Sequence, residues 1–216
     1  MNDSVQARTA VIDACLWMVR EGLTFGTWGN ISLRLDDDRM LITPSKVPYE
    51  EMKPEDLIVM GLNGDILSGS RLPTSERELH RGILASRPDI RAIIHTHSAC
   101  AMGVSTLDGG IPPLSEEMCQ LIGGAVPVTS RFVPSEQHKE LGDEVVRTLG
   151  DKNALLIRNH GAICCGRSLD EAKVCCQVVE KSARIYLAVK GSGYHPVEEP
   201  WVTAGRNYYL YAYGKT

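Results

Sequence analysis

The chain has 216 residues, of which 43% are hydrophobic and 23% are charged, and its formal net charge is -4. This length and composition fit one globular domain with a substantial core, and the slightly acidic balance excludes a general attraction to nucleic acid or to anionic membranes. No segment approaches the roughly 20 apolar residues of a membrane span, and the N-terminus lacks the basic start and apolar run of a secretory signal, so we expect one cytoplasmic domain over residues 1–216.

The first third of the chain predicts one helix followed by antiparallel strands. Residues 5–20 carry apolar side chains at the spacing of an amphipathic helix. Four short strands are expected next, at residues 31–35, 40–43, 56–60 and 65–67. The aspartates at 36–38 and the Asn63-Gly64 pair are turn signals between strands, so these strands are expected to form hairpins.

The remainder of the chain predicts helices and strands in mixed order. Helices are expected from Pro73 to about residue 86, over residues 135–149, and from Ser168 to residue 189. The first and last of these helices begin with capping-box sequences, Ser75 with Glu78 and Ser168 with Glu171. Further strands are expected at residues 91–97, 125–128, 154–157 and 162–165. This order is typical of an α/β domain with antiparallel hairpins and without regular βαβ alternation.

The pattern of the seven cysteines indicates free thiols. Their number is odd, the chain is not small, and no C-x-x-C spacing occurs. Reduced and mostly buried thiols are therefore expected, and a zinc site built from cysteines is not.

Histidines at the ends of two predicted strands are candidate metal ligands. His95 and His97 close an apolar strand, and side chains at i and i+2 of a strand point to the same face. Two imidazoles placed in this way can bind one metal ion at about 2.0–2.1 Å. His160 also follows an apolar strand and precedes Gly161, where a neutral imidazole has room for a ligand in front of it.

A carboxylate can complete this set of ligands. Glu76 lies in the first turn of a predicted helix, where backbone amides favour a negative charge. Each candidate alone also fits a structural role, but three histidines with one carboxylate match a zinc site whose carboxylate can be displaced by substrate. His80 lies four residues after Glu76, and a supporting role beside the ligands is predicted for it. His138 in a polar helix and His195 in a loop fit a metal site less well.

Three polar segments have the composition of anion-binding sites, at residues 26–30, 43–46 and 74–75. Glycines let the backbone of the first approach a ligand, the second places a hydroxyl beside a lysine, and the third lies at a helix start next to Glu76. Each segment alone also fits an ordinary loop or turn. The candidate phosphate- and substrate-binding residues are Thr27, Gly29, Asn30, Ser45, Lys46, Thr74 and Ser75.

These motifs together resemble those of the class II aldolase/adducin family, from about residue 6 to 190. The motifs that carry the resemblance are GTWGNIS at 26–32, LITPS at 41–45, PTSE at 73–76, HTH at 95–97 and NHG at 159–161. They occur in the order and spacing of the family. Within the family, the branch that cleaves L-fuculose 1-phosphate is the most similar.

The resemblance implies a single domain with a central, mostly antiparallel sheet flanked by helices. It implies zinc, or alternatively manganese or cobalt, on His95, His97 and His160, with Glu76 as a ligand in the resting state. It implies a phosphate held by Gly29, Asn30, Ser45, Thr74 and Ser75. It also implies a homotetramer with active sites between subunits, and a C-terminal tail near the site, residues 191–216, in which Tyr213 matches a tyrosine that closes the site.

Two positions depart from the family pattern. Lys46 stands where the fuculose-phosphate aldolases have glycine, so it either adds charge to the phosphate site or only changes the loop. The family's proton-donor tyrosine is missing, since no tyrosine occurs between Tyr49 and Tyr186. Glu116 and Glu117 are the candidates for the acid–base role in its place.

The expected activity is reversible cleavage of a 1-phosphoketose into dihydroxyacetone phosphate and an aldehyde. Candidate substrates are fuculose 1-phosphate, 5-deoxyribulose 1-phosphate and 5-methylthioribulose 1-phosphate. Glu76 is expected to leave the metal when substrate binds and to protonate the carbon of the departing half, while Glu116, Glu117 or Tyr213 acts on the C4 hydroxyl. The alternatives are a sugar-phosphate epimerase or a methylthioribulose-phosphate dehydratase of the same family, and a non-catalytic adducin-like scaffold.

Overall fold

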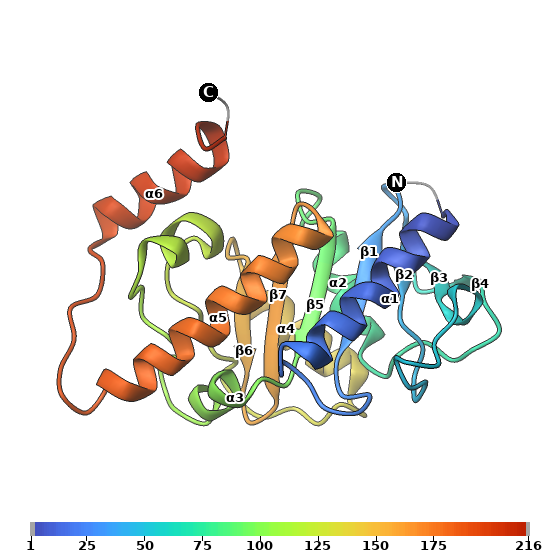
Figure 1. Cartoon of the computed structure of the whole chain (residues 1–216), viewed down its shortest axis with the longest axis horizontal. Helices are drawn as coiled ribbons and strands as arrows, with labels where there is room; N and C mark the ends of the chain where they lie inside the picture. Colours follow the sequence, from blue (N-terminus) through green and yellow to red (C-terminus); the bar gives the residue numbers. More distant parts are fainter. Residues whose placement is uncertain (1–2, 215–216) are drawn as a thin grey trace.

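One sheet forms the centre of the computed structural model, which describes residues 3–214 (Figure 1). Its strands are β1 Asn30–Arg34, β2 Arg39–Ile42, β3 Ile58–Gly61, β4 Ile66–Ser68, β5 Ala92–Thr96, β6 Ala154–Ile157 and β7 Gly161–Gly166. They lie in the order β4-β3-β2-β1-β5-β7-β6, and every neighbouring pair is antiparallel. The predicted α/β class with a mostly antiparallel sheet is confirmed.

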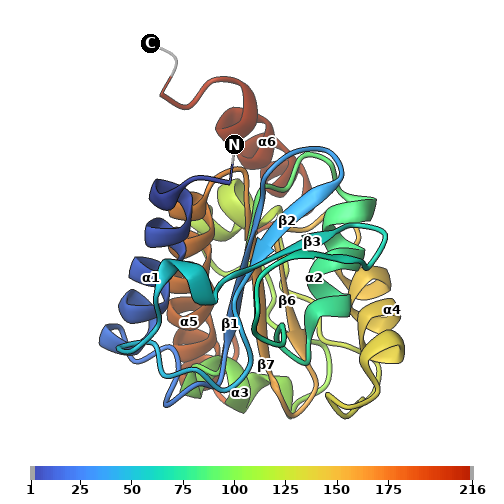
Figure 2. The same cartoon turned by 90° about the vertical axis from the view of Figure 1, so that its right-hand side faces the viewer.

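Helices cover both faces of this sheet. They are α1 Val5–Arg20, α2 Arg77–Ser86, α3 Ala99–Ser105, α4 His138–Leu149, α5 Leu169–Val189 and α6 Glu199–Tyr211, with a 3-10 turn at Pro54–Asp56 and a π-helix at Met118–Ile122. Helices α1 and α5 lie on one face, and α2 and α4 lie on the other (Figure 2). Among the described residues, no helix has the length and apolar character needed to cross a membrane.

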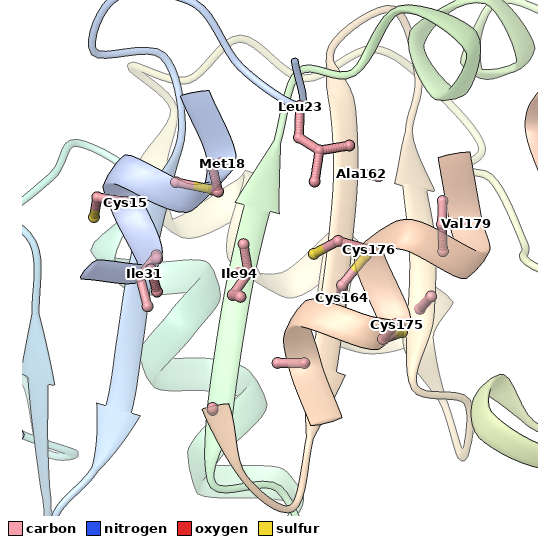
Figure 3. Packing of buried hydrophobic residues seen from close by; sticks show 14 of the residues in the cluster. Cys15, Met18, Leu23, Ile31, Ile94, Ala162, Cys164, Cys175, Cys176 and Val179 are labelled. Atoms are coloured by element: carbon pink, nitrogen blue, oxygen red, sulfur yellow. The ribbon is translucent and has the colours of Figure 1, made fainter. Parts of the chain in front are cut away.

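Alternation along the strands sends successive side chains into two separate cores. Ile31 of β1 and Ile94 of β5 pack against α1 and α5, together with Cys164 of β7 (Figure 3). Ile93 of β5 faces the other way, toward α2 and α4. Because both faces are covered, the polar side of β1 is buried as well, and its residues are Asn30, Ser32 and Arg34.

The start of α2 differs from its prediction. The helix begins at Arg77, and the predicted capping box of Ser75 with Glu78 does not form. Instead Glu76 occupies the N-cap position, and its backbone amide donates to the hydroxyl of Thr74 at 3.3 Å. The second predicted capping residue is confirmed, since the Ser168 hydroxyl accepts from the amide of Glu171 at 3.1 Å.

Two further boundaries are corrected. The strand predicted at residues 125–128 is wrong, because Val126 and Val128 make only isolated bridges, to Ile111 and Leu156. Helix α4 begins at His138, and the preceding residues 135–137 lie in a loop. The prediction of free, mostly buried thiols is confirmed, since none of the seven cysteines is paired and only Cys100 is more than slightly exposed.

Candidate metal centre

His95, His97 and His160 come together at one end of the sheet. His95 lies in β5, His97 follows that strand directly, and His160 lies in the turn between β6 and β7. The antiparallel pairing of β5 with β7 places Thr96 opposite Ala162, so the end of β5 lies beside this turn. One ring nitrogen from each histidine lies within 4.8 Å of the other two.

Hydrogen bonding directs the lone pair of His95 Nε2 toward the neighbouring imidazoles, and burial keeps the rings of His95 and His97 neutral. Nδ1 of His95 donates to the carbonyl of Ala162 at 3.0 Å, so the lone pair of the neutral ring is on Nε2. That Nε2 lies 2.9 Å from Nε2 of His97. Burial lowers the pKa of His95, and burial and then the neighbouring imidazoles lower the pKa of His97 to about 3. Both rings are therefore neutral near pH 7, as metal ligation requires.

Glu76 faces the histidines from the N-cap of α2. It is only 5% exposed, with Oε2 at 3.3 Å from Nε2 of His95 and Oε1 at 3.0 Å from Nε2 of His160. Burial opposes its ionisation, but the two imidazoles and a hydrogen bond from Asn30 outweigh burial, so the pKa of Glu76 lies below its ordinary value. The carboxylate is therefore ionised at neutral pH.

This donor set fits a divalent metal ion. Oε1 of Glu76 is buried and makes no assigned hydrogen bond among the described residues, although Nε2 of His160 lies 3.0 Å away. A buried anionic oxygen and convergent imidazole lone pairs repel one another unless a proton or a cation lies between them. Imidazole with carboxylate is a ligand set that suits divalent transition metals and zinc.

A cleft of about 230 Å³ opens in front of Glu76, His97 and His160. It is lined as well by residues of all three predicted anion-binding segments. These residues are Thr27, Gly29, Asn30, Ser45, Lys46, Thr74 and Ser75. Segments far apart in the sequence thus form one wall beside the candidate metal ligands, and one small molecule can contact both.

Hydrogen bonds hold the anion-binding segments around this cleft. The amide of Thr74 donates to the carbonyl of Thr43 at 3.1 Å, which joins the second and third segments. The hydroxyl of Tyr49, three residues after the second segment, donates to the carbonyl of Gly29 at 2.7 Å and ties the first segment to that part of the chain. Gly29 has a φ of 129°, and a Cβ there would lie 2.9 Å from the carbonyl oxygen of His95, so this position requires glycine.

The two predicted acid–base glutamates do not lie at the cleft of their own chain. Glu116 accepts a hydrogen bond from Gln120 at 2.8 Å, and Glu117 pairs with Lys181 of α5. The hydrogen bond from Lys181 lowers the pKa of Glu117 to about 2. A carboxyl group with so low a pKa is a poor proton donor near pH 7.

The C-terminal tail contains a helix that the sequence analysis did not predict. In α6, Arg206 donates to the carbonyls of Gln120 and Leu121 at 2.8 Å, so the helix packs on the π-helix. Tyr213 is 59% exposed and contacts the rings of Tyr208 and Tyr209. Helix α6 lies toward the end of the molecule opposite α3, which follows His97 closely (Figures 1 and 2). Tyr213 is not among the residues that line the cleft of its own chain.

Three residues that line the cleft had no role assigned from the sequence, and they are Trp28, Pro44 and Ser135. Trp28 belongs to a quoted motif but had no assigned role, and it lines the cleft with 68% of its surface exposed. Ser135 lines the cleft from the loop before α4. The only signal at Ser135 was its preference for helix starts, which does not report proximity to a distant histidine.

Comparison with known proteins gives one consistent result. The profile of the family described as "Class II Aldolase and Adducin N-terminal domain" matches residues 9–187. L-fuculose phosphate aldolase of Escherichia coli (strain K12) is 35% identical over 177 residues, covering 82% of this chain and 80% of that protein. The 5-deoxy-D-ribulose 1-phosphate aldolase of Bacillus thuringiensis serovar kurstaki is 35% identical over 179 residues, with 82% of each chain covered. A solved structure of L-fuculose 1-phosphate aldolase superposes with a TM-score of 0.90 at 28% identity, covering 96% of this chain and 98% of that one.

Proposed function

The chain belongs to the class II aldolase and adducin family, and from this premise we propose that it reversibly cleaves a 1-phosphoketose into dihydroxyacetone phosphate and an aldehyde. The observation that carries the proposal is the single cleft in which Glu76, His97 and His160 face three anion-binding segments. As a class II aldolase the protein is a metal-dependent enzyme. We propose zinc as its metal, with manganese or cobalt as alternatives, because three imidazoles and one carboxylate suit zinc.

In this scheme His95, His97 and His160 hold the metal ion, which supplies Lewis acidity toward the ketose carbonyl. The hydroxyls and backbone amides of the three segments bind the phosphate. Lys46 contributes the only Lys or Arg side chain among the residues that line the cleft. Its ammonium group adds a charge-assisted contact to an otherwise neutral set of donors.

Glu76 is the proposed acid–base group at the carbon beside the carbonyl. In the direction of synthesis, it leaves its position against the histidines and removes a proton from the hydroxymethyl carbon of dihydroxyacetone phosphate. In the direction of cleavage, it returns a proton to the same carbon after the C3–C4 bond has broken.

We further propose that the protein is a cytoplasmic homotetramer and that a neighbouring subunit supplies the group acting on the C4 hydroxyl. Glu116, Glu117 and Tyr213 remain the candidates, and of these Glu117 would first have to separate from Lys181, which lowers its pKa. Their distance from the cleft of their own chain supports a contribution between subunits, as do the exposed aromatic side chains of α6, which include Trp201 and Tyr211. The mass of the intact protein in solution, from light scattering, tests the tetramer, and a monomer would contradict it.

The direct test is a product assay on the zinc-loaded protein. Fuculose 1-phosphate, 5-deoxyribulose 1-phosphate and 5-methylthioribulose 1-phosphate are each supplied, and dihydroxyacetone phosphate is measured with and without a chelator. We expect release from at least one ketose, loss of release after chelation, and recovery on adding zinc, because in this scheme the ion held by the histidines would supply the Lewis acidity at the carbonyl. The ranking of rates then identifies the aldehyde.

A ketose without a 1-phosphate group is the matched control, and it should be cleaved slowly because it cannot use the anion-binding segments. Release that persists in chelator would contradict a metal-dependent reaction. Consumption of a ketose phosphate with no dihydroxyacetone phosphate would instead identify an epimerase or a dehydratase.

Lys46 provides a specific prediction about phosphate binding. Its φ of 61° lies in the left-handed region, which glycine adopts without strain and lysine does not. Replacing Lys46 with glycine is expected to raise KM by about threefold to tenfold, since an exposed ammonium–phosphate contact contributes on the order of 1 kcal/mol. The melting temperature should not fall, because strain is relieved. Lys46→Arg is the control that keeps the charge and should keep KM; an unchanged KM in Lys46→Gly shows that the lysine only shapes the loop.

A further inference from the structure

One fully buried polar side chain next to the cleft has no role in the scheme above. His80 of α2 is 0% exposed. Its Nε2 lies 2.6 Å from Oδ1 of Asn30, and its Nδ1 lies 2.8 Å from Oγ of Ser32. Asn30 in turn donates through Nδ2 to Oε2 of Glu76 at 2.7 Å. These contacts form one continuous buried path from Ser32 through His80 and Asn30 to Glu76.

Hydrogen-bonding capacity fixes the direction of every bond along this path. The ionised carboxylate of Glu76 can only accept, so the Asn30 amide must present Nδ2 to it and turn Oδ1 toward His80. An amide oxygen also only accepts, so Nε2 of His80 must carry the proton. Burial lowers the pKa of His80 to about 3, so the ring is neutral. Its Nδ1 therefore accepts from the hydroxyl of Ser32.

We propose that His80 is a positioning residue whose Nε2–H locks the Asn30 amide in the orientation that donates to Glu76. Rotating this amide by half a turn would place Oδ1 against the carboxylate, where two acceptors would repel each other. The lock therefore sets the direction of the carboxylate, and it leaves the second N–H of the Asn30 amide available to a ligand in the cleft that Asn30 lines. The inference rests on the proposed function in one respect, which is that Glu76 is the group whose orientation governs turnover.

The fold brings these residues together through two simple periodicities. Asn30 and Ser32 are i and i+2 on β1 and share one face of the strand. Glu76 and His80 are i and i+4 across the N-cap and first turns of α2 and share one face of the helix. An apolar residue would fill position 80 at lower cost if packing were its only role, because a buried imidazole is unfavourable unless both nitrogens are bonded.

Three substitutions separate positioning from packing. His80→Gln keeps an N–H donor near the position of Nε2, His80→Asn is too short to reach Asn30, and His80→Leu removes both nitrogens. We expect kcat to fall about 10–100-fold in His80→Asn and His80→Leu, with a smaller change in KM, and His80→Gln to recover most of the loss. Thermal melts give the stability of each variant, so that kcat is compared between variants of equal stability. A His80→Gln variant no faster than an equally stable His80→Asn variant would overturn the proposal.

The tautomer gives a test in the unaltered protein without substrate. Correlation spectra between the ring protons and ring nitrogens of ¹⁵N-labelled protein identify which nitrogen of His80 carries the proton. We expect a protonated Nε2 and an unprotonated Nδ1, and the opposite tautomer overturns the inference whatever the activity.

Zinc affinity, measured by competition with a chelator, does not depend on which reaction the protein catalyses. It therefore tests the positioning role of His80 separately from the proposed function. His80→Leu should bind zinc about 10–100-fold more weakly, because Glu76 loses its fixed orientation. If the unaltered protein cleaves no ketose phosphate while the tautomer and the zinc affinities come out as expected, then the proposed function fails and the positioning role stands. Unchanged zinc affinity together with unchanged kcat in a folded His80→Leu variant overturns the positioning role.

Discussion

Replacing Glu76 with glutamine is expected to lower kcat for ketose cleavage by about 10²–10⁴-fold, which is the usual contribution of a general acid–base group. Glutamine has nearly the same shape and can still accept the hydrogen bond from Asn30, but it cannot give or take a proton. KM should change much less, because the phosphate-binding segments are untouched. Steady-state kinetics with the best ketose phosphate, at saturating zinc, measure both quantities.

The matched control is Glu78→Gln on the same helix. Glu78 forms a partly exposed ion pair with Arg81, so its loss should change stability by less than about 1 kcal/mol and leave kcat unchanged. Zinc content must be measured in each variant, since Glu76 also faces the candidate ligands His95 and His160. A zinc-loaded Glu76→Gln variant with near-normal kcat would remove Glu76 from the proton transfer and leave it as a ligand only.

A single methyl group at position 161 is expected to be nearly as damaging. Gly161 begins β7 directly after His160, and a Cβ at this position would overlap the carbonyl oxygen of Thr96 and lie 3.0 Å from Cε1 of His95. Either the pairing of β5 with β7 must open or the ring of His95 must turn. A displacement of about 1 Å at a reacting group costs about 100-fold in rate, and overpacking of this kind costs about 1–3 kcal/mol in stability.

We therefore expect Gly161→Ala to bind zinc at least about 10-fold more weakly and to lose about 100-fold in kcat. Chelator competition and calorimetry measure the affinity and the stability. Gly191→Ala is the matched control, since a Cβ at Gly191 meets nothing within 4 Å and its backbone does not lie in the left-handed region. Equal zinc affinity in the two variants would show that the β5–β7 contact does not govern the geometry of His95.

The convergence of His95, His97 and His160 was predictable because these residues lie at positions where strand geometry leaves little freedom. A strand carries i and i+2 to one face, so His95 and His97 had to be close together. His160 follows a recognisable apolar strand, and Glu76 lies at the recognisable start of a helix. The three polar segments were recognisable as loops with donors, and the resemblance of their motifs to one family indicated that they share a site.

Tertiary packing decided the features that the sequence did not predict. The alternation of β1 favours one polar, solvent-facing side, yet Asn30, Ser32 and Arg34 are buried under α2, where each finds a partner. No local pattern reports that a helix will cover such a stripe. The same limit applies at the start of α2, where Thr74 rather than Ser75 supplies the hydroxyl that accepts the Glu76 amide.

Residues 125–128 and the C-terminal segment show two other ways in which a local sequence pattern fails to predict secondary structure. Val126 and Val128 have the β propensity of a strand, but each makes only one isolated bridge, to Ile111 and to Leu156, so no regular strand pairing forms. Gly205 weakens the helical pattern of α6, and contacts such as those of Arg206 with the π-helix hold this helix in place. Contacts made by a distant segment, or by another subunit, leave no periodic signal in the sequence.

Because six of the seven cysteines are buried, the rate at which each thiol reacts with a reagent in solution reports how often the fold around it opens. An alkylating reagent can reach Cys100 in the native state, but it reaches Cys164 and Cys175 only when α5 separates from β7 (Figure 3). Under conditions in which reclosing is faster than alkylation, each rate gives the free energy of the opening that exposes that thiol. Mass spectrometry of partly alkylated protein would therefore rank the regions of the fold by local stability without any substitution.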